Sequence, residues 1–451
     1  MSTFSDVISV INGFVWGPWM LVLLVGTGLF LSIRLGFMQF SNLPYALKLA
    51  FSPARQDRRS EGDISHFQAL MTALAATIGT GNIVGVATAV VLGGPGAVFW
   101  MWITALVGMA TKYSEAVLAV KYRITDENGE MAGGPMYYIE RGMGCKWLAW
   151  LFAFFGAVAA FGIGNLVQVN AVAGNVHDTF GVAPWITGLI LAFFTALVIL
   201  GGIKSIGKVT GVMVPLMAVI YILAGLFIMI VNYNMVPYAL KIIFTEAFTA
   251  QAGFGALIGT TIRYGVARGV FSNEAGLGSA PIAAAAAKTD HPCRQALVSM
   301  TGTFLDTIIV CSITGISLVM ANIYPYIEEA QAAALTSRSF EYFLPGAGGI
   351  IVTVGLILFA YSTVLGWSYY GEKCFYYLTG FKGIKAYRIF FCFVVFFGAI
   401  SQLDLVWNIA DTFNGAMAIP NLIALLALSG VVVSETKDFQ KIRAREKAGK
   451  V

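Results

Sequence analysis

The sequence predicts an all-α polytopic membrane protein with eleven transmembrane helices. Three observations support this fold class: the composition, the spacing of the apolar segments, and the distribution of basic residues between them. The 451 residues are 58% hydrophobic and 11% charged, with a mean hydropathy of +0.78. Soluble chains are about 45–50% apolar and about 25% charged. The composition therefore excludes a soluble enzyme, a disordered protein and a nucleic-acid binder.

Eleven apolar segments are long enough, or nearly so, for the roughly 20-residue helix that crosses the hydrocarbon core. They run over residues 12–33, 67–92, 96–120, 147–173, 184–202, 209–231, 253–286, 295–322, 347–371, 386–402 and 406–433. The longest hydrophilic gap, 34–66, has room for one amphipathic helix with an apolar face of Phe40, Leu43, Leu47 and Phe51. Since no gap holds a second domain, residues 1–451 are expected to form one membrane domain.

The basic residues between these segments orient the helices. With the N-terminus outside, the inside gaps hold twenty-three of the 28 Lys and Arg residues, whereas the outside gaps hold only Lys241 and Arg338. Cytoplasmic loops carry such an excess of positive charge. The chain is therefore expected in the cell membrane with a cytoplasmic C-terminus, residues 434–451 forming a basic tail. The first ten residues lack the basic region of a cleavable signal, so 12–33 is expected to remain as a span.

Two of the spans are interrupted by glycine mixed with polar residues. The second span contains Ala-Thr-Ile-Gly-Thr-Gly-Asn at 76–82, and the seventh contains Gly-Val-Phe-Ser-Asn-Glu-Ala-Gly-Leu-Gly-Ser at 269–279. Glycine disfavours a helix interior by about 0.8–1.0 kcal/mol relative to alanine. In lipid, unwound backbone is tolerated only where protein buries it or where it lines a cavity. Close helix packing would explain the glycines, but not the Thr, Asn and Glu beside them.

The two breaks lie five spans apart. Paired broken segments at corresponding positions are typical of inverted-repeat transporters with a binding site at the midplane. An odd offset requires the two halves to be inverted relative to one another. We therefore expect a first repeat over 67–231, an inverted second repeat over 253–433, and an extra N-terminal helix at 12–33.

The ends of a broken helix have a defined chemistry. Unpaired amides attract an anion and unpaired carbonyls attract a cation, so a zwitterion such as an amino acid satisfies both. The carboxylate is expected on the amides of Gly79, Thr80, Gly81 and Asn82. The ammonium is expected on carbonyls near Thr77 and Phe271, with help from Asn273, and Phe271 would close one wall.

Charged residues within membrane spans are expensive and indicate function by default. Glu274 lies in the seventh-span break, and Arg263 and Arg268 precede it. They could form a gating or coupling pair at an outer vestibule, or a static ion pair. Asp306 and Asp411 are expected to make helix-packing hydrogen bonds. The i,i+3 spacing of Lys112 and Glu115 favours a local surface pair near the inner interface.

Polar residues in two further spans can complete a site. Asn165 and Gln168 share a face of the fourth span, and Ser362 and Thr363 interrupt an apolar run in the ninth. Hydroxyl oxygens two helices after a break suit a hard monovalent cation. Hydrogen bonds at a helix interface are the alternative. The five cysteines and three histidines are scattered and predict neither a disulfide framework nor a metal cluster.

Two long motifs carry a family resemblance. The run Gly-Gly-Pro-Gly-Ala-Val-Phe-Trp-Met-Trp at 93–102, preceded by Gly-Thr-Gly-Asn-Ile at 79–83, closely resembles the alanine or glycine:cation symporter family. The run Phe-Ser-Asn-Glu-Ala-Gly-Leu-Gly-Ser-Ala-Pro at 271–281 is also similar to that family. The resemblance covers essentially the whole chain and is nearest to archaeal, methanogen-type members.

The resemblance implies a leucine-transporter-like fold of five plus five inverted helices, with discontinuous helices at 67–92 and 253–286. It implies uptake of alanine or glycine with sodium, or less often with protons. The backbone carbonyls of Ala75 and Ile78 would face Ser362 and Thr363 around one sodium ion. The implied substrate residues are Thr77, Gly79, Thr80, Gly81, Asn82, Gln168, Phe271, Asn273 and Gly276. Because no acidic partner for Asn82 is evident in the sequence, a single cation site is expected.

The predicted function is a secondary symporter that works by alternating access. Its partners would be the amino acid, sodium and the lipid bilayer, with no cofactor, nucleic acid or obligate protein partner. A proton-coupled transporter, an ion or solute channel and an intramembrane enzyme are the alternatives. The sequence shows neither a Walker-type loop for ATP nor a nucleophile with its base. It leaves open the coupling ion and its stoichiometry, the chirality of the substrate, the oligomeric state and the resting conformation.

Overall fold

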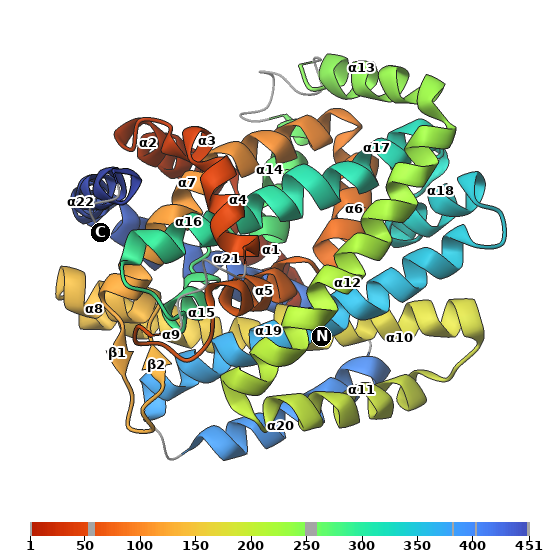
Figure 1. Cartoon of the computed structure of the whole chain (residues 1–451). Coiled ribbons are helices and arrows are strands. Elements are labelled where there is room, and N and C mark those ends of the chain that lie inside the picture. Colours follow the sequence, from red (N-terminus) through yellow and green to blue (C-terminus); the bar gives the residue numbers. More distant parts are fainter. Residues whose placement is uncertain (1, 53–58, 249–258, 381–382, 402–403, 449–451) are drawn as a thin grey trace.

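The computed structural model describes residues 2–52, 59–248, 259–380, 383–401 and 404–448. These residues form a helical bundle whose longer helices run side by side across the molecule (Figure 1). The described strands form a single two-stranded hairpin, β1 (Ile124–Thr125) with β2 (Met131–Ala132). The predicted all-α class therefore describes the structure.

The first half of the chain supplies six spans in the predicted order. The N-terminal segment is divided at Gly17, where a proline follows, into α1 (Ser2–Val15) and α2 (Pro18–Arg34). The second span is broken, as predicted, between α5 (His66–Thr77) and a π-helical turn (Gly81–Gly85) that continues into α6 (Val86–Gly93). The remaining spans are α7 (Gly96–Lys121), α9 with α10 (Lys146–Phe161, Val167–Phe180), α11 (Pro184–Ile199) and α12 (Gly202–Val231).

The second half supplies five spans. The first of them is again broken, between α14 (Thr260–Asn273) and the short α15 (Pro281–Ala285). Residues 253–258 of the predicted seventh span lie outside the described residues. The others are α16 with α17 (Pro292–Thr303, Ser312–Ala321), α19 (Gly348–Thr379), α20 (Ile384–Ile400) and α21 (Asp404–Ala427).

Shorter elements connect the spans. They are α3 (Met38–Ser41), α4 (Leu43–Phe51), α8 (Pro135–Met143), α13 (Val236–Glu246) and α18 (Leu335–Phe343). The 19-residue α22 (Ser429–Lys447) follows the last span. The predicted amphipathic helix exists as α4, but its buried residues are Ala46, Leu49 and Ala50, whereas Phe40 and Phe51 are exposed. The predicted apolar face is therefore only partly exposed, because Leu43 packs against the core and the ring of Phe51 contacts that of Phe67.

Seven helices among the described residues are long and apolar enough to cross a membrane, and the bent pair α5 and α6 makes eight spans. The other predicted spans fall just short of that length or carry charge. Helix α11 has 16 residues and α20 has 17, while α14 contains Arg263 and Arg268. Each of the eleven predicted positions is nevertheless occupied by a helix.

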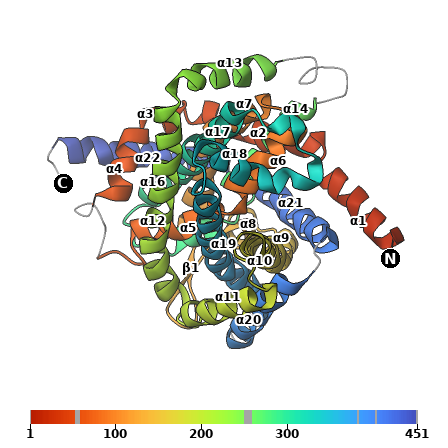
Figure 2. The same ribbon diagram turned by 90° about the vertical axis from the view of Figure 1, so that its right-hand side faces the viewer.

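The centre of the bundle is built around α7. This helix is buried along most of its length and packs against both α14 and α16. Figure 2 shows α12, α11 and α20 at the perimeter and α1 extending from the bundle beside α21. The local surface pair predicted for Lys112 and Glu115 is wrong, because their exposed fractions are 3% and 0%.

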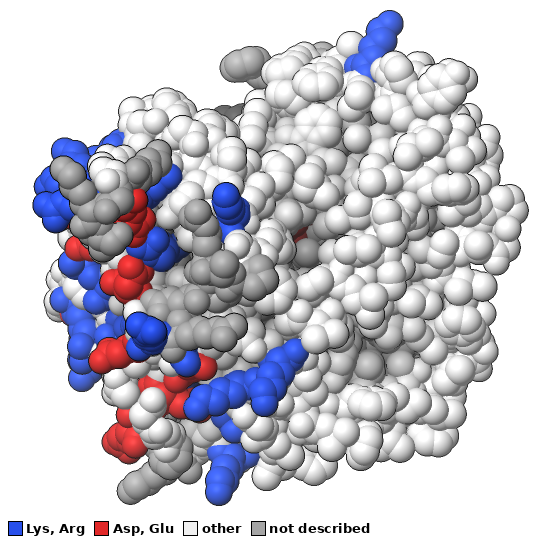
Figure 3. Space-filling view, in the orientation of Figure 1, with Lys and Arg blue, Asp and Glu red and all other residues white. Residues whose placement is uncertain are grey.

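Charged side chains are concentrated at one end of the molecule. In the face shown in Figure 3 they gather over the end that carries α22, α8 and the β1–β2 hairpin, while the opposite end is nearly free of charge. Helix α22 is fastened to this end by the ion pairs Lys121–Glu435 and Arg294–Glu446. Such asymmetry is the structural counterpart of the positive-inside pattern in the sequence.

Candidate functional site

The first break exposes amides that meet neutral oxygens. Helix α5 begins with a Ser65–Gln68 capping box, ends at Thr77, and resumes after a bend of 52°. The Gly79 N–H donates to Asn82 Oδ1 at 3.0 Å, and the Thr80 N–H donates to Gln168 Oε1 at 3.3 Å. The Thr80 hydroxyl is buried and has no hydrogen-bond partner among the described residues. A buried polar group of this kind is normally satisfied by a protein group, a water or a ligand.

The carbonyl end of the same break meets two hydroxyls from α19. Ser362 Oγ lies 3.1 Å from Ala75 O and 3.4 Å from Ile78 O. Thr363 Oγ1 lies 3.1 Å from Ala75 O. Both hydroxyl-bearing residues are fully or almost fully buried. Four oxygen atoms thus converge in a buried place, and oxygen is the donor that a hard cation selects.

Glycine is required where these two ends meet. A Cβ on Gly79 would stand 2.4 Å from Thr363 Oγ1 and 3.3 Å from Gln168 Oε1. A Cβ on Gly81 would stand 3.3 Å from the ring of Phe271 and from Ser272 Cα. The close approach places the oxygens around Ala75 next to the amides of Gly79 and Thr80, and it brings the first break against the second.

The second break is a turn with three left-handed residues. Glu274 has a φ of 56°, Gly276 of 94° and Gly278 of 85°. Left-handed backbone is readily adopted by glycine but is unusual for glutamate. The Glu274 carboxylate accepts hydrogen bonds from Ser279 Oγ at 2.6 Å and from Trp367 Nε1 at 3.0 Å. These two bonds hold the strained turn in place.

The two ends of this second break are occupied by full charges from α7. Lys112 Nζ donates to Asn273 O, the carbonyl at the end of α14, at 2.8 Å. Glu115 Oε1 accepts from the amides of Gly276 and Gly278, both at 3.1 Å. The positive charge at the carbonyl end and the negative charge at the amide end each match the helix dipole. Asn421 adds a hydrogen bond from Nδ2 to Glu115 Oε1 at 2.7 Å.

A buried carboxylate joins the two breaks. Asp306 Oδ1 accepts from Asn82 Nδ2 at 2.7 Å, and its Oδ2 accepts from Ser272 Oγ at 2.9 Å. Thr307 Oγ1 also donates to Oδ2, at 2.7 Å. The sequence offered no acidic partner for Asn82, because Asp306 lies 224 residues away in the chain. Only the packing of the π-helical turn Phe304–Cys311, between α16 and α17, against the breaks reveals it.

The two arginines of α14 lie on a cavity rather than on Glu274. This cavity encloses about 370 Å³ between α1, α14 and α21, and we call it the vestibule cavity. Among the described residues the structure records no ion pair for Arg263, Arg268 or Glu274. The residues that line it are Ser9, Asn12, Gly13, Trp16, Arg263, Tyr264, Ala267, Arg268, Phe271, Asn408 and Asp411.

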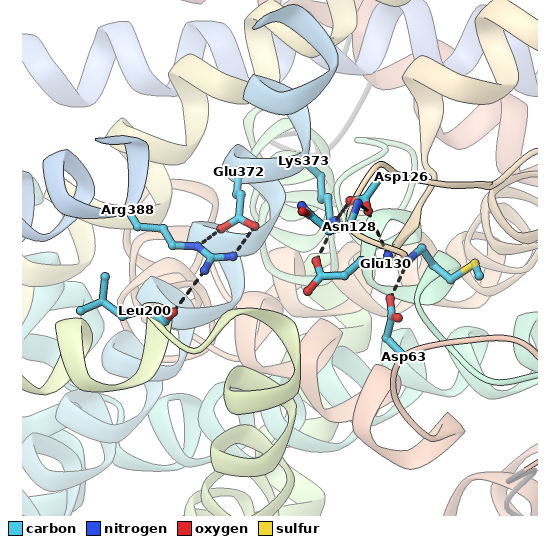
Figure 4. Close-up of polar contacts among 9 residues, drawn as sticks. Asp63, Asp126, Asn128, Glu130, Leu200, Glu372, Lys373 and Arg388 are labelled. Carbon is cyan, nitrogen blue, oxygen red and sulfur yellow. Dashed lines mark hydrogen bonds and ion pairs between the residues drawn. The ribbon is translucent and has the colours of Figure 1, made fainter. Parts of the chain in front are cut away.

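At the charged end an ionic network joins the β1–β2 hairpin to α19 and α19 to α20 (Figure 4). Lys373 of α19 lies between two carboxylates of the hairpin loop, 3.2 Å from Asp126 and 3.3 Å from Glu130. Arg388 of α20 pairs with Glu372, the neighbour of Lys373, at 2.6 Å. The network ties the hairpin to α19, the helix that also carries Ser362 and Thr363.

The same hairpin is tied to both broken helices. The Met131 N–H donates to Asp63 Oδ2 at 2.8 Å, just before α5. Burial raises the pKa of Asp63, and this hydrogen bond acts in the opposite direction. Arg123 donates to three carbonyls, Ala285 O and Ala287 O after α15 and Glu61 O before α5, at 2.7 to 3.0 Å. The hairpin therefore holds together the start of α5 and the end of α15, the outer ends of the two broken helices.

The sequence-predicted site residues fall into two groups. The residues that come together at the first break are Ala75, Ile78, Gly79, Thr80, Gln168, Ser362 and Thr363. Next to them lie Asn82, Gly81 and Phe271. Thr77 turns its hydroxyl back to Ala73 O at 3.2 Å, so only its backbone faces the break. Asn273 and Gly276 lie at the second break, where Lys112 and Glu115 engage their backbone.

The solved structure of MhsT in complex with L-phenylalanine is similar to this architecture. Its TM-score is 0.59 at 13% identity, over 83% of this chain and 98% of that chain. The chain therefore has the leucine-transporter-like fold, an all-helical membrane fold of inverted repeats with discontinuous helices.

The family follows from the sequence itself. The model of the sodium:alanine symporter family matches residues 1–451, so the chain belongs to that family. Membership of this family makes the molecule a multi-pass secondary transporter and not an enzyme. The sodium/alanine symporter AgcS of Methanococcus maripaludis is 68% identical over 98% of this chain and 99% of its own length. An uncharacterized transporter of Haemophilus influenzae is 54% identical over 98% of this chain and 97% of its own length.

Proposed function

We propose that the chain imports a small neutral amino acid, alanine or glycine, together with sodium by alternating access. The observation that carries this proposal is the convergence of Ala75 O, Ile78 O and the hydroxyls of Ser362 and Thr363 beside the amides of Gly79 and Thr80. One position thus offers oxygens to a cation, and the adjoining position offers amide donors to a carboxylate.

The charges around the breaks support binding of cations. Among the described residues, three buried carboxylates (Glu115, Glu274 and Asp306) face one buried ammonium, Lys112. When all four groups are ionised, this centre has two more negative than positive charges. Buried charge is costly unless it is compensated. A sodium ion would compensate one of these two charges, whereas a zwitterionic amino acid adds no net charge.

The packing around the first break supports a small substrate. The β-carbon position of Gly79 is within 2.4 Å of Thr363, and that of Gly81 is within 3.3 Å of Phe271. We propose that the carboxylate binds the amides of Gly79, Thr80, Gly81 and Asn82, with Gln168 and Phe271 as neighbouring walls. The ammonium would face Thr77 O and the Phe271–Asn273 backbone, and Gly276 would adjoin it from the second break.

Two structural assignments accompany this function as proposals. We assign residues 67–231 and 253–433 to the two inverted repeats, with 12–33 as the extra helix and 434–451 as a cytoplasmic tail. We also assign the charged end of the molecule to the cytoplasm and the N-terminus to the outside of the cell membrane, as the excess of basic residues favours. Arg263 and Arg268 would then lie on the outer side, where they line the vestibule cavity, whereas Glu274 is held by Ser279 and Trp367 at the second break.

Uptake into proteoliposomes tests the function. Radiolabelled L-alanine should accumulate under an inward sodium gradient and not in a matched potassium control. Uptake that ignores sodium and follows an imposed pH gradient would instead indicate proton coupling, with the buried Glu274 as the first residue to replace. The absence of alanine and glycine uptake under either gradient would contradict the proposed substrate.

A further inference from the structure

The π-helical turn that follows the first break deprives one carbonyl of its usual donor. In an α-helix the Val86 N–H would donate to Asn82 O, four residues earlier. In the turn Gly81–Gly85 it donates instead to Gly81 O and to Ile83 O. Asn82 is fully buried, and a buried carbonyl is normally paired. The Asn82 carbonyl is therefore open to a donor from another helix.

The hydroxyl of Thr314 on α17 is that donor. Thr314 Oγ1 donates to Asn82 O at 2.8 Å, a shorter bond than its 3.3 Å contact with Val310 O. Its oxygen also lies 2.8 Å from the hydroxyl oxygen of Tyr221 on α12. Because the Thr314 hydrogen is used at Asn82, Tyr221 is the donor in this second bond. Both side chains are buried, and hydrogen bonds in such a chain strengthen one another.

Helix α18 also holds the turn. The hydroxyl of Thr336, which is fully buried, donates to Ile83 O at 3.0 Å. The ring of Phe340, one turn farther along α18, stacks on the ring of Tyr221, with centroids 5.6 Å apart and an interplanar angle of 21°. Helix α18 therefore contacts the π-helical turn directly and also supports the tyrosine that begins the hydroxyl chain.

Asn82 transmits the position of the turn to the proposed substrate site. Its Oδ1 accepts the Gly79 N–H at 3.0 Å, and its own N–H donates to Gly79 O at 3.3 Å. Its Nδ2 donates to Asp306 Oδ1 at 2.7 Å. Gly79 is closely packed as well, because a Cβ there would stand 2.4 Å from Thr363 Oγ1. A misplacement of the turn by about 1 Å would therefore disturb the amides that receive the carboxylate.

We propose that Thr314 and Thr336 are positioning residues for the central site. By holding the carbonyls of Asn82 and Ile83, they keep the Gly79 amide where the carboxylate of the amino acid binds it. The proposal rests on the proposed transport of a small amino acid. Each hydroxyl acts on the substrate only through the π-helical turn. Loss of either hydroxyl should therefore weaken alanine binding and leave the later steps of transport unchanged.

Uptake of radiolabelled L-alanine into proteoliposomes at saturating sodium tests the proposal, with KM and the maximal rate per folded transporter measured for each variant. Thr314→Val keeps the shape of the side chain but removes the donor, so KM should rise about tenfold while the maximal rate stays within about twofold. Thr336→Val should raise KM about threefold, because Ile83 O keeps the Val86 N–H. Thr314→Ser and Thr336→Ser keep the hydroxyl and should restore the KM of the unaltered chain.

Ser339→Ala is the matched control on α18. Ser339 is fully buried one turn after Thr336, and its hydroxyl has no hydrogen-bond partner among the described residues, so KM should not change. An unaltered KM in the valine variants, with or without a lower maximal rate, would overturn the proposal and leave the transport function standing. A KM raised equally by serine and valine, or failure of both valine variants to fold, would have the same meaning. If only one valine variant folds, its KM decides. No alanine uptake by the unaltered chain would overturn both the positioning role and the transport function.

Discussion

The two broken helices have the same kind of backbone interruption, but the protein satisfies them differently. At the first break the carbonyls of Ala75 and Ile78 meet hydroxyls, and the amides of Gly79 and Thr80 meet side-chain amide oxygens. At the second break the carbonyl of Asn273 meets an ammonium, and the amides of Gly276 and Gly278 meet a carboxylate. Neutral partners occupy one break and full charges the other.

This difference explains why one break suits exchangeable ligands. A hydroxyl can turn its lone pair toward an arriving cation, so Ser362 and Thr363 can change from donors to ligands without leaving a buried charge unpaired. Lys112 and Glu115 have no such freedom, because removal of either from its position would leave a charge uncompensated inside the protein. Together they act like a permanently bound zwitterion at the second break. The comparison can be tested by exchanging or deleting these partners.

The largest effect is expected from Lys112→Met. This change removes the only ammonium found near three buried carboxylates in the described structure, and breaking such a buried charge arrangement costs about 3–5 kcal/mol. The thermal stability of the detergent-solubilised protein should fall sharply, and uptake should reach background. Lys121→Met on the same helix is the control, because its ion pair with Glu435 is partly exposed. Wild-type stability of Lys112→Met would show that the second break does not depend on fixed charge.

A large effect confined to transport is expected from Gly79→Ala. The new methyl group would lie 2.4 Å from Thr363 Oγ1 and displace the hydroxyl from Ala75 O. A misplacement of about 1 Å at a reacting site can cost roughly 100-fold in rate. We expect the rate of uptake to fall by about that factor. Gly85→Ala is the matched control, since its Cβ meets nothing within 4 Å. Equal uptake by the two variants would contradict the placement of the site at the first break.

A smaller and more specific effect is expected from Thr363→Val. The substitution keeps the shape and removes one oxygen, so the apparent affinity for sodium in uptake assays should fall roughly tenfold, a loss of about 1.4 kcal/mol. Ser368→Ala is a control on the same helix, because Ser368 Oγ bonds only to its own helix, at Leu365 O, among the described residues. An unchanged sodium dependence in Thr363→Val would remove α19 from the cation site.

The smallest effect is expected at the charged end, from Lys373→Met. Loss of the ion pairs with Asp126 and Glu130 should loosen the contact between α19 and the hairpin loop without disturbing either break. The neighbouring Cys374 is buried and free, so its labelling by a thiol reagent should accelerate a few-fold in a background without the other cysteines. Lys385→Met should leave the labelling rate unchanged, because Lys385 is an exposed lysine on the wall of a separate cavity that Asp126 and Lys373 also line. Equal labelling rates in the two variants would show that the ion pairs of Lys373 do not restrict access to Cys374.

The sequence predicted the elements that depend on local composition. The length of the apolar segments predicted the spans, and glycine beside polar residues predicted the position of both breaks to within a few residues. Pairing Ser362 and Thr363 with Ala75 and Ile78 came from the resemblance, and the structure brings all four residues together. Because the interruption of an apolar run is a local signal, it could be read without knowing the packing.

What the sequence could not predict depends on contacts between distant helices. The i,i+3 spacing of Lys112 and Glu115 fits a surface pair as well as it fits two separate caps on another helix. Asp306 and Trp367 had no local feature that linked them to Asn82 and Glu274. Their roles arise only when the turn Phe304–Cys311 and α19 pack against the breaks, which hydropathy and spacing do not encode.

The length of α19 has a mechanical consequence. This uninterrupted 32-residue helix carries Thr363 near its middle and Lys373 ten residues farther on, about 15 Å away along the axis at 1.5 Å per residue. A tilt of roughly 10° pivoting at Thr363 would move Lys373 by about 2.5 Å at that lever length. That displacement would separate ion pairs that are now 3.2 to 3.3 Å long. Occupancy of a site a few ångströms wide could in this way be converted into the opening or closing of the far end of the protein.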